Sequence, residues 1–242
     1  MNPALRVGVF YWFVMALLAA LIQPVRAVVF SPEWLQKLAA APIPAGEGVP
    51  PAWVLLDETT MEIDANGEAT ETRRVAIRLR VNEAAGKFAS GSVYYNSKTG
   101  HLLSTEAWLL RKGEALYDKS GSDWTDDSTV NGGTIIDETR ARRIDLSEHA
   151  VGGDVFGFET RLRRPLLVAQ IGAGFGWIVP VQEERFNLIL PAGFSIKTFT
   201  DGSRPLVATT VPERGRWSWV LHVPDYAPKE PWVAPAARVD AR

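Results

Sequence analysis

The chain has 242 residues, 46% of them hydrophobic, which is enough for one large domain or two small lobes with a buried core. Its 26 basic and 28 acidic residues nearly balance, which argues against a nucleic-acid-binding surface. The sequence contains no cysteine, which excludes a disulfide framework, a thiolate zinc site and a cysteine nucleophile within these residues.

Residues 1–27 have the pattern of a bacterial Sec-type signal peptide. Arg6 precedes an uncharged run over residues 7–22, and Ala27 supplies a small residue at the expected cleavage position. A retained membrane anchor is the alternative, because a run of this length crosses most of a bilayer. We therefore expect a periplasmic or secreted protein that contacts the membrane only if this segment is kept.

The sequence of residues 28–51 predicts a short helix followed by an extended segment that leads into the next domain. Ser31 suits the N-cap position and Pro32 the first helical position, and apolar residues then recur at helical spacing until Pro42. The next ten residues, counted from Pro42, contain four prolines and two glycines. This composition is typical of a linker.

Residues 53–81 predict a long β-hairpin. Apolar residues alternate with polar ones on both sides of the segment 64–67, as expected for strands with one buried face. Within that segment Asn66 and Gly67 accept the positive φ angles that a tight hairpin turn requires. The hairpin begins an all-β domain predicted over residues 52–228.

Three arginines lie on the polar face of the second hairpin strand: Arg74, Arg78 and Arg80. They are the first candidates for binding an anion or a protein partner. Exposed strand charges more often form a solvated face, and pairing with Glu58 or Glu62 across the ladder is the expected alternative.

The rest of the domain reads as short strands separated by Gly, Pro and Asp-Gly signals. The predicted strands are residues 92–96, 101–110, 115–117, 141–146, 154–162, 183–190, 195–200, 206–211 and 216–223. About ten strands and one short N-terminal helix predict a mainly β fold, an antiparallel β-sandwich or two packed sheets. The polar residues 120–133 are predicted to form a loop. The glycine-rich residues 172–176 are predicted to be a flexible or bulged turn, because Trp177 replaces the third glycine of a dinucleotide fingerprint.

Few residues suggest a catalytic or ligand-binding role. Trp217 and Trp219 share one face of a predicted strand and would stack on sugars if exposed, although a core position is favoured for tryptophan. A carboxylate pair such as Asp123 with Asp127, or Glu183 with Glu184, would be needed for a hydrolase. Adjacent strand residues point to opposite faces, which counts against the second pair. No metal-ligand spacing, catalytic motif or cofactor-binding motif is found.

A series of strand and turn motifs runs through residues 53–58, 62–67, 73–74, 106–107, 111–114, 141–146, 151–159, 179–181 and 190–193. Together these motifs span about residues 52–235 and resemble a bacterial domain-of-unknown-function family, number 3857. The resemblance implies a β scaffold that usually precedes a transglutaminase-like domain. The proline-rich tail, residues 229–242, is similar to the family's exit toward that domain. The motifs are strands and turns, so the resemblance implies no catalytic residue.

Three functional hypotheses follow. The first is a non-catalytic exported β module without a cofactor, which binds or positions a protein, peptide or envelope polymer beside a transglutaminase-like or peptidase partner. The second is an envelope hydrolase that uses a carboxylate pair. The third is a scaffold left by the loss of a catalytic domain.

Overall fold

The structure is a computed structural model. It describes residues 30–42, 50–128, 138–166, 171–194, 196–202, 209–211, 215–222 and 237–241. The predicted signal peptide lies outside these ranges. None of the helices within them has the length and hydrophobicity to cross a bilayer.

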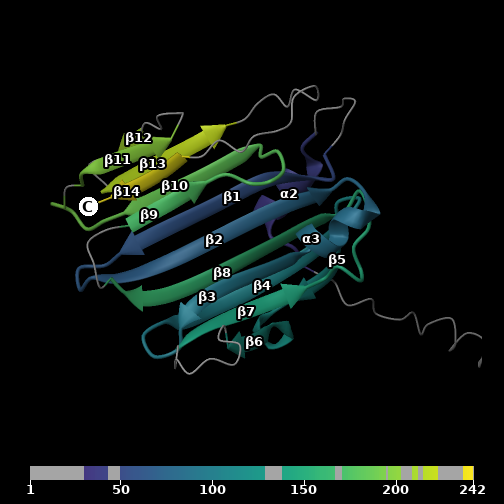
Figure 1. The fold of residues 1–242 in the computed structure, drawn as a ribbon, viewed down its shortest axis with the longest axis horizontal. Coiled ribbons are helices and arrows are strands. Elements are labelled where there is room, and N and C mark those ends of the chain that lie inside the picture. Colours follow the sequence, from purple (N-terminus) through teal and green to yellow (C-terminus); the bar gives the residue numbers. More distant parts are fainter. Residues whose placement is uncertain are drawn as a thin grey trace, which may run out of the picture.

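A large mixed sheet and two smaller sheets make up the described part of the chain (Figure 1). The large sheet has the strand order β12 (Thr209–Val211), β13 (Arg216–His222), β10 (Glu183–Ile189), β1 (Ala52–Ile63), β2 (Glu68–Leu79), β8 (Val155–Pro165), β4 (His101–Arg111) and β5 (Glu114–Lys119). One small sheet has the order β3 (Ser90–Asn96), β7 (Thr139–Asp145) and β6 (Thr125–Ser128). The other has the order β11 (Thr198–Gly202), β14 (Ala237–Ala241) and β9 (Ile171–Phe175). The predicted mainly β fold is confirmed.

The described residues contain two α-helices, and both are short. The predicted N-terminal helix is present as α2 (Glu33–Ala40), and α3 (Ala85–Phe88) follows β2 after a 3₁₀ turn. The N-cap of α2 is Pro32, one residue later than predicted, because the Pro32 carbonyl accepts the Leu35 and Gln36 N–H groups. Ser31 instead accepts a hydrogen bond from the Gln36 side chain.

The predicted hairpin is formed by β1 and β2. Asp64 Oδ1 accepts the N–H groups of Asn66 at 2.8 Å and Glu68 at 3.0 Å, and Gly67 has a φ of 81°. A short polar side chain and a glycine thus close the turn that their sequence predicts.

β1 is the strand that positions the site. It pairs antiparallel with β2 on one side and parallel with β10 on the other, whereas a fully antiparallel arrangement was expected. A register shift between Val54 and Leu56 turns both Leu55 and Leu56 toward the hydrophobic cluster under α2. After the shift, alternation places Asp57 on one face of the sheet and Glu58 on the other.

Each face of the large sheet is covered differently. On one face, β3, β7 and α3 cover a large hydrophobic cluster, which includes Val75, Phe156 and Phe158. Further along the same face, β9 packs over a second cluster around Leu188 and Trp219. On the opposite face, α2 covers only one end, where Leu35 is fully buried among side chains of β1, β2, β4 and β8. The middle of the sheet therefore carries polar side chains on both faces.

Two segments predicted as a loop or a turn form strands, and residues 237–241 of the predicted proline-rich tail form β14. Residues 125–128, within the predicted loop, form β6 because they pair with β7, where Arg140 holds Asp126 at 2.7 Å. Residues 171–175, which overlap the predicted glycine-rich turn of residues 172–176, form β9 because their main chain pairs with β14. In both cases a strand remote in sequence compensates for low intrinsic strand propensity.

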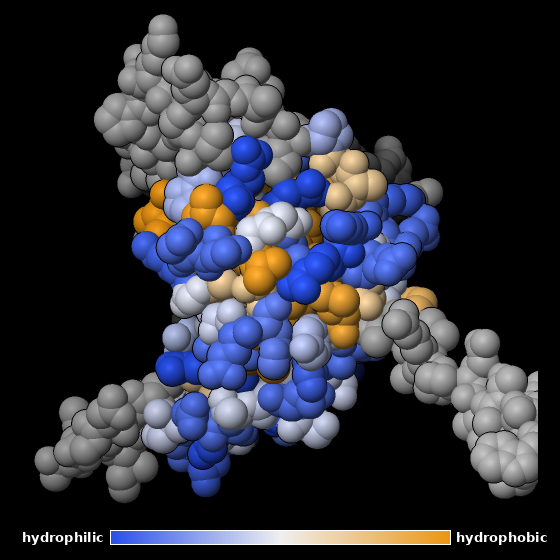
Figure 2. Space-filling model, turned by 90° about the vertical axis from the view of Figure 1, so that its right-hand side faces the viewer, coloured by the Kyte–Doolittle hydropathy of each residue, from blue (hydrophilic) through white to orange (hydrophobic). Residues whose placement is uncertain are grey.

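Figure 2 shows the molecule from the end where α2, α3 and β5 lie. The described residues on that side are mostly hydrophilic, with hydrophobic residues in small separate groups. Scattered exposed apolar side chains are normal for a soluble surface and do not by themselves mark a docking site.

Candidate functional site

A polar cleft lies where β9 covers the large sheet. Its volume is about 330 Å³, and it is lined by residues of β1, β2, β8, β9 and β10. Two carboxylates meet there, because the parallel register places Asp57 of β1 directly opposite Glu184 of β10. The cleft is therefore a product of the β1–β10 pairing.

Asp57 is held by two donors. The Arg73 guanidinium binds it with two hydrogen bonds, Nε to Oδ1 at 3.1 Å and Nη2 to Oδ2 at 2.9 Å. Trp177 Nε1 also donates to Oδ2 at 2.9 Å. Burial disfavours the charge on Arg73, but the attraction and hydrogen bonds of Asp57 outweigh it and raise the pKa of the guanidinium. Both carboxylate oxygens of Asp57 are thus already engaged.

Glu184 differs from Asp57 in its burial and in its hydrogen-bond partners. Its residue is only 4% exposed, Oε1 accepts the Gly176 N–H at 2.9 Å, and Oε2 is buried without a hydrogen-bond partner in the described part of the chain. Burial raises the pKa of Glu184 to about 7, and the negative charge of Asp57 adds to that shift. The Gly176 N–H and Arg73 oppose the shift without cancelling it. Glu184 therefore changes its charge near neutral pH.

A second cavity continues the cleft. Its volume is about 350 Å³, and it shares Glu71 and Arg164 with the first. These two side chains form an ion pair at 3.5 Å between Oε2 and Nη2. β3 lines the far side, with Tyr94 and its neighbours. We call the two cavities together the β9–β3 groove.

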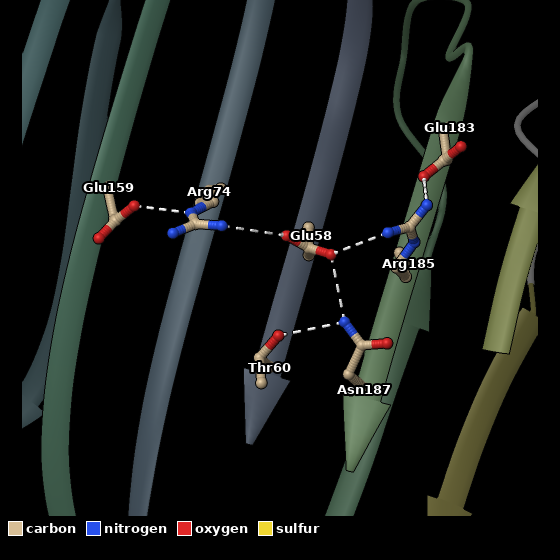
Figure 3. Close-up of polar contacts among 7 residues, drawn as sticks. All are labelled: Glu58, Thr60, Arg74, Glu159, Glu183, Arg185 and Asn187. Carbon is tan, nitrogen blue, oxygen red and sulfur yellow. Dashed lines mark hydrogen bonds and ion pairs between the residues drawn. The ribbon is translucent and has the colours of Figure 1, made fainter. Parts of the chain in front are cut away.

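The opposite face of the sheet carries a ladder of charges centred on Glu58 (Figure 3). Arg74 lies between Glu159, with Nε to Oε2 at 2.6 Å, and Glu58, with Nη1 to Oε2 at 3.8 Å. Arg185 and Asn187 approach the other Glu58 oxygen, Oε1, at 3.3 and 3.2 Å. Side chains from four neighbouring strands are thereby joined, which makes this face a cross-strand network.

The three candidate arginines have separate environments. Arg74 is engaged in the ladder, and its pairing with Glu58 is the alternative expected from the sequence. Arg78 Nη2 donates to the carbonyls of Leu38 at 3.5 Å and Ala39 in the last turn of α2, and to that of Ala41, just after the helix, at 3.3 Å. The structure shows no side-chain ion pair for Arg80 within the described residues, which leaves it as the one of the three available to a partner.

The tryptophan pair belongs to the core. Trp219 is 1% exposed and packs against Phe186 with ring centroids 5.7 Å apart. Trp217 is partly buried and packs on the same cluster. Neither ring forms the exposed platform that sugar stacking would need, as the preference for a core position anticipated.

The carboxylates proposed from the sequence do not form a pair in the β9–β3 groove. Asp123 pairs with Lys119 at 3.2 Å and accepts the Ser120 N–H, and neither it nor Asp127 lines the β9–β3 groove. Glu183 binds Arg185 on the ladder face, while Glu184 lines the groove, so the expected alternation is confirmed. No group of three or more potential metal ligands occurs among the described residues.

Sequence reasoning missed the grouping of Asp57, Arg73 and Glu184. Two signals pointed to it: Asp57 follows five apolar residues on a predicted strand, and Glu184 has the same alternation phase as the apolar Phe186 and Leu188. Both are polar groups at positions whose alternation predicts burial. Their proximity could not be inferred, because it depends on a parallel pairing between distant segments.

The fold and the groove define a β-rich module with small sheets layered on one large sheet. The family described as "Domain of Unknown Function with solved-structure structure" (DUF3857) matches residues 65–230, more than half of the chain. The chain belongs to this family. Among curated proteins, none matches the sequence.

A solved structure shares the fold. It is the crystal structure of "a putative protease from Parabacteroides distasonis ATCC 8503", with a TM-score of 0.65 and 14% sequence identity. The likeness covers 79% of this chain and 40% of that one, so the chain spans about two fifths of the length of the protein it matches. At this identity the likeness shows the fold alone.

Proposed function

We propose that the chain is an exported, non-catalytic β module that binds or positions a protein, peptide or envelope polymer in the β9–β3 groove. The observation that carries the proposal is the state of the groove's ionic groups. Asp57 with Arg73 and Glu71 with Arg164 neutralise one another, and Glu184 keeps an unused acceptor atom. Such a surface offers binding contacts without an activated nucleophile.

The proposed setting is beside a transglutaminase-like or peptidase partner. The Parabacteroides protein supports it, because there the same fold occupies only part of a longer chain described as a protease. The sequence resemblance to a family that precedes transglutaminase-like domains supports it as well. The signal-peptide pattern of residues 1–27 supports export to the periplasm or beyond. A scaffold whose catalytic domain was lost would differ only in lacking such a partner.

A second candidate function, an envelope hydrolase, is favoured by one observation. Asp57 and Glu184 are neighbouring carboxylates in a cleft, and the pKa of Glu184 is raised to about 7, as a general acid requires. The engagement of both Asp57 oxygens by Arg73 and Trp177 weighs against it, because a nucleophile or general base needs a free oxygen.

One experiment separates the two functions. Purified peptidoglycan is incubated with the chain, the bound fraction is measured by co-sedimentation, and the soluble fraction is analysed for released fragments by mass spectrometry. Affinity purification from the envelope, with the same readout, identifies protein partners. We expect retention or a specific partner without cleavage. Cleavage that disappears in both Asp57→Asn and Glu184→Gln would establish the hydrolase and refute the binding module.

A further inference from the structure

Two strand edges border the β9–β3 groove. Within the described residues β9 pairs only with β14 and β3 only with β7, so each has one edge without a strand partner. Both strands line the groove. Exposed edges present main-chain N–H and C=O groups, which an extended peptide can satisfy by adding as a further strand.

β9 is a glycine-rich edge strand. Its sequence is Ile-Gly-Ala-Gly-Phe, and Gly172, Ala173 and Gly174 line the cleft. A Cβ atom added at Gly174 would meet no atom within 4 Å, so there is open space over this face of the strand. Glycine in a strand commonly marks a close approach of another backbone.

Glu184, whose Oε2 atom has no hydrogen-bond donor within the described residues, lines the same cleft. A buried oxygen without a donor is costly, and a ligand that supplies a donor removes that cost. Oε1 is already taken by the Gly176 N–H, so a single oxygen remains. One oxygen suits the compact charge of an ammonium group better than a guanidinium, whose planar fork favours two oxygens.

We propose that the groove binds an extended peptide that pairs with the free edge of β9, and that an ammonium group on this peptide, of the lysine type, binds Glu184 Oε2. The inference rests on the proposed binding function and specifies its ligand. Peptides with free side-chain amines, whether in proteins or in envelope polymers, share this chemistry.

The charges around Glu184 make this binding sensitive to pH. Asp57 faces it from β1, Arg73 and Glu71 come from β2, and Arg164 comes from β8, with Arg185 next to it on β10. Arg73 pairs with Asp57, and Arg164 pairs with Glu71. The negative charge of ionised Glu184 therefore has no arginine of its own in this group. An ammonium group favours ionised Glu184, so the preference for it is expected to be larger at pH 8 than at pH 6.

The test uses the whole 242-residue chain, in a mild non-ionic detergent because residues 7–22 carry no charge. Three probes are compared by isothermal titration: acetyl-Ala-Val-Lys-Val-Ala-amide, the same peptide with norleucine in place of lysine, and the lysine peptide with alternate main-chain nitrogens methylated. We expect the lysine peptide to bind at least tenfold more tightly than the norleucine peptide at pH 8, and the methylated peptide to lose binding.

Two variants locate the contact. Glu184→Gln should abolish the preference for lysine over norleucine, while Glu183→Gln, its neighbour on the other face, should keep it. Equal binding of the lysine and norleucine peptides to the unmodified chain would overturn the ammonium site. Tight binding of the methylated peptide would overturn strand addition. If no peptide binds but peptidoglycan or a protein partner does, this inference fails and the proposed function stands. If nothing binds, both fail.

Discussion

Asp57 and Glu184 are direct partners across the parallel strands β1 and β10, and Arg73 binds Asp57 from the neighbouring strand β2. The Arg73 guanidinium therefore acts on both carboxylates, by hydrogen bonds to Asp57 and by charge attraction to Glu184. Asp57 receives both hydrogen bonds of the guanidinium, whereas Glu184 receives one main-chain N–H and is buried. The donors of this pair are divided unequally, and burial raises the pKa of Glu184 to about 7.

The first prediction concerns stability and pH. The pKa of Glu184 is about 7 in the folded protein and close to its ordinary value of 4.5 in the unfolded chain. The folded state therefore binds more protons between these values, and stability falls as the pH rises through that window. Glu184→Gln should raise the free energy of unfolding by roughly 2–3 kcal/mol at pH 8, with a much smaller gain at pH 5. Urea denaturation at both pH values measures this.

The matched control is Glu183→Gln. It changes a carboxylate one residue away that binds Arg185 on the opposite face. It should not reproduce the gain at pH 8. A Glu184→Gln protein whose stability difference from the unmodified chain is the same at pH 5 and pH 8 would show that burial does not shift this group.

The second prediction concerns Asp57 and Arg73. Removing Arg73 leaves Asp57 with only the Trp177 N–H and also removes a charge that lowers the pKa of Glu184. The Arg73 side chain is 37% exposed, so solvent screens the pair and the loss should be moderate. A double-mutant cycle of Asp57→Ala and Arg73→Ala, followed by urea denaturation at pH 7, should give a coupling energy of about 1 kcal/mol. Simple additivity of the two single variants would contradict the contact.

The third prediction separates Arg78 from Arg80. Arg78 donates to the final carbonyls of α2, so Arg78→Ala should destabilise the protein by about 1 kcal/mol and increase amide exchange in α2. Arg80→Ala should change stability by less than about 0.5 kcal/mol, as at an ordinary surface position. Hydrogen exchange and thermal denaturation provide the measurements.

Charge reversal at these positions also tests the partner hypothesis. Arg80→Glu should leave the fold intact, and any loss of partner recovery can then be assigned to that side chain. Reversal at Arg74 or Arg78 would disturb the ladder or the helix as well. Unchanged recovery with Arg80→Glu would remove this face from the list of partner surfaces.

The fourth prediction concerns the contact between α2 and the sheet. A Cβ atom at Gly157 would lie 2.6 and 2.7 Å from the two methyl carbons of Leu35, which is fully buried. Gly157→Ala should therefore destabilise the protein by about 1–3 kcal/mol through overpacking. Gly86→Ala is the control, since that position in α3 has open space and the change should be neutral or slightly stabilising. Equal melting temperatures for both variants would argue against the close packing of α2.

The hairpin could be predicted because its determinants are local. Alternation, an Asn-Gly turn and sheet formation between adjacent segments all appear within about thirty residues of sequence. The strand character of β6 and β9 could not be predicted in this way. Asp, Ser and Gly disfavour strands on their own, and the pairing that orders them comes from β7 and β14.

The site shows the same division. Burial of Trp219 and the opposite directions of Glu183 and Glu184 follow from composition and alternation. The meeting of Asp57, Arg73 and Glu184 does not, because it depends on the register of β10 against β1. A single-residue change in that register would place Glu183 in the cleft and Glu184 on the ladder face.

β10, the parallel partner of β1, is synthesised long after β1, and this order has a consequence for folding. Glu58 and Asn187, joined by a hydrogen bond across the β1–β10 pair, are 129 residues apart in the chain. Until β10 is made, β1 is an edge strand with an apolar face and unpaired main-chain groups. Pairings of such sequence separation slow folding and prolong exposure to aggregation. We expect shortened chains that lack residues 183–189 to aggregate at this edge, and a nascent chain to depend on chaperones until those residues emerge.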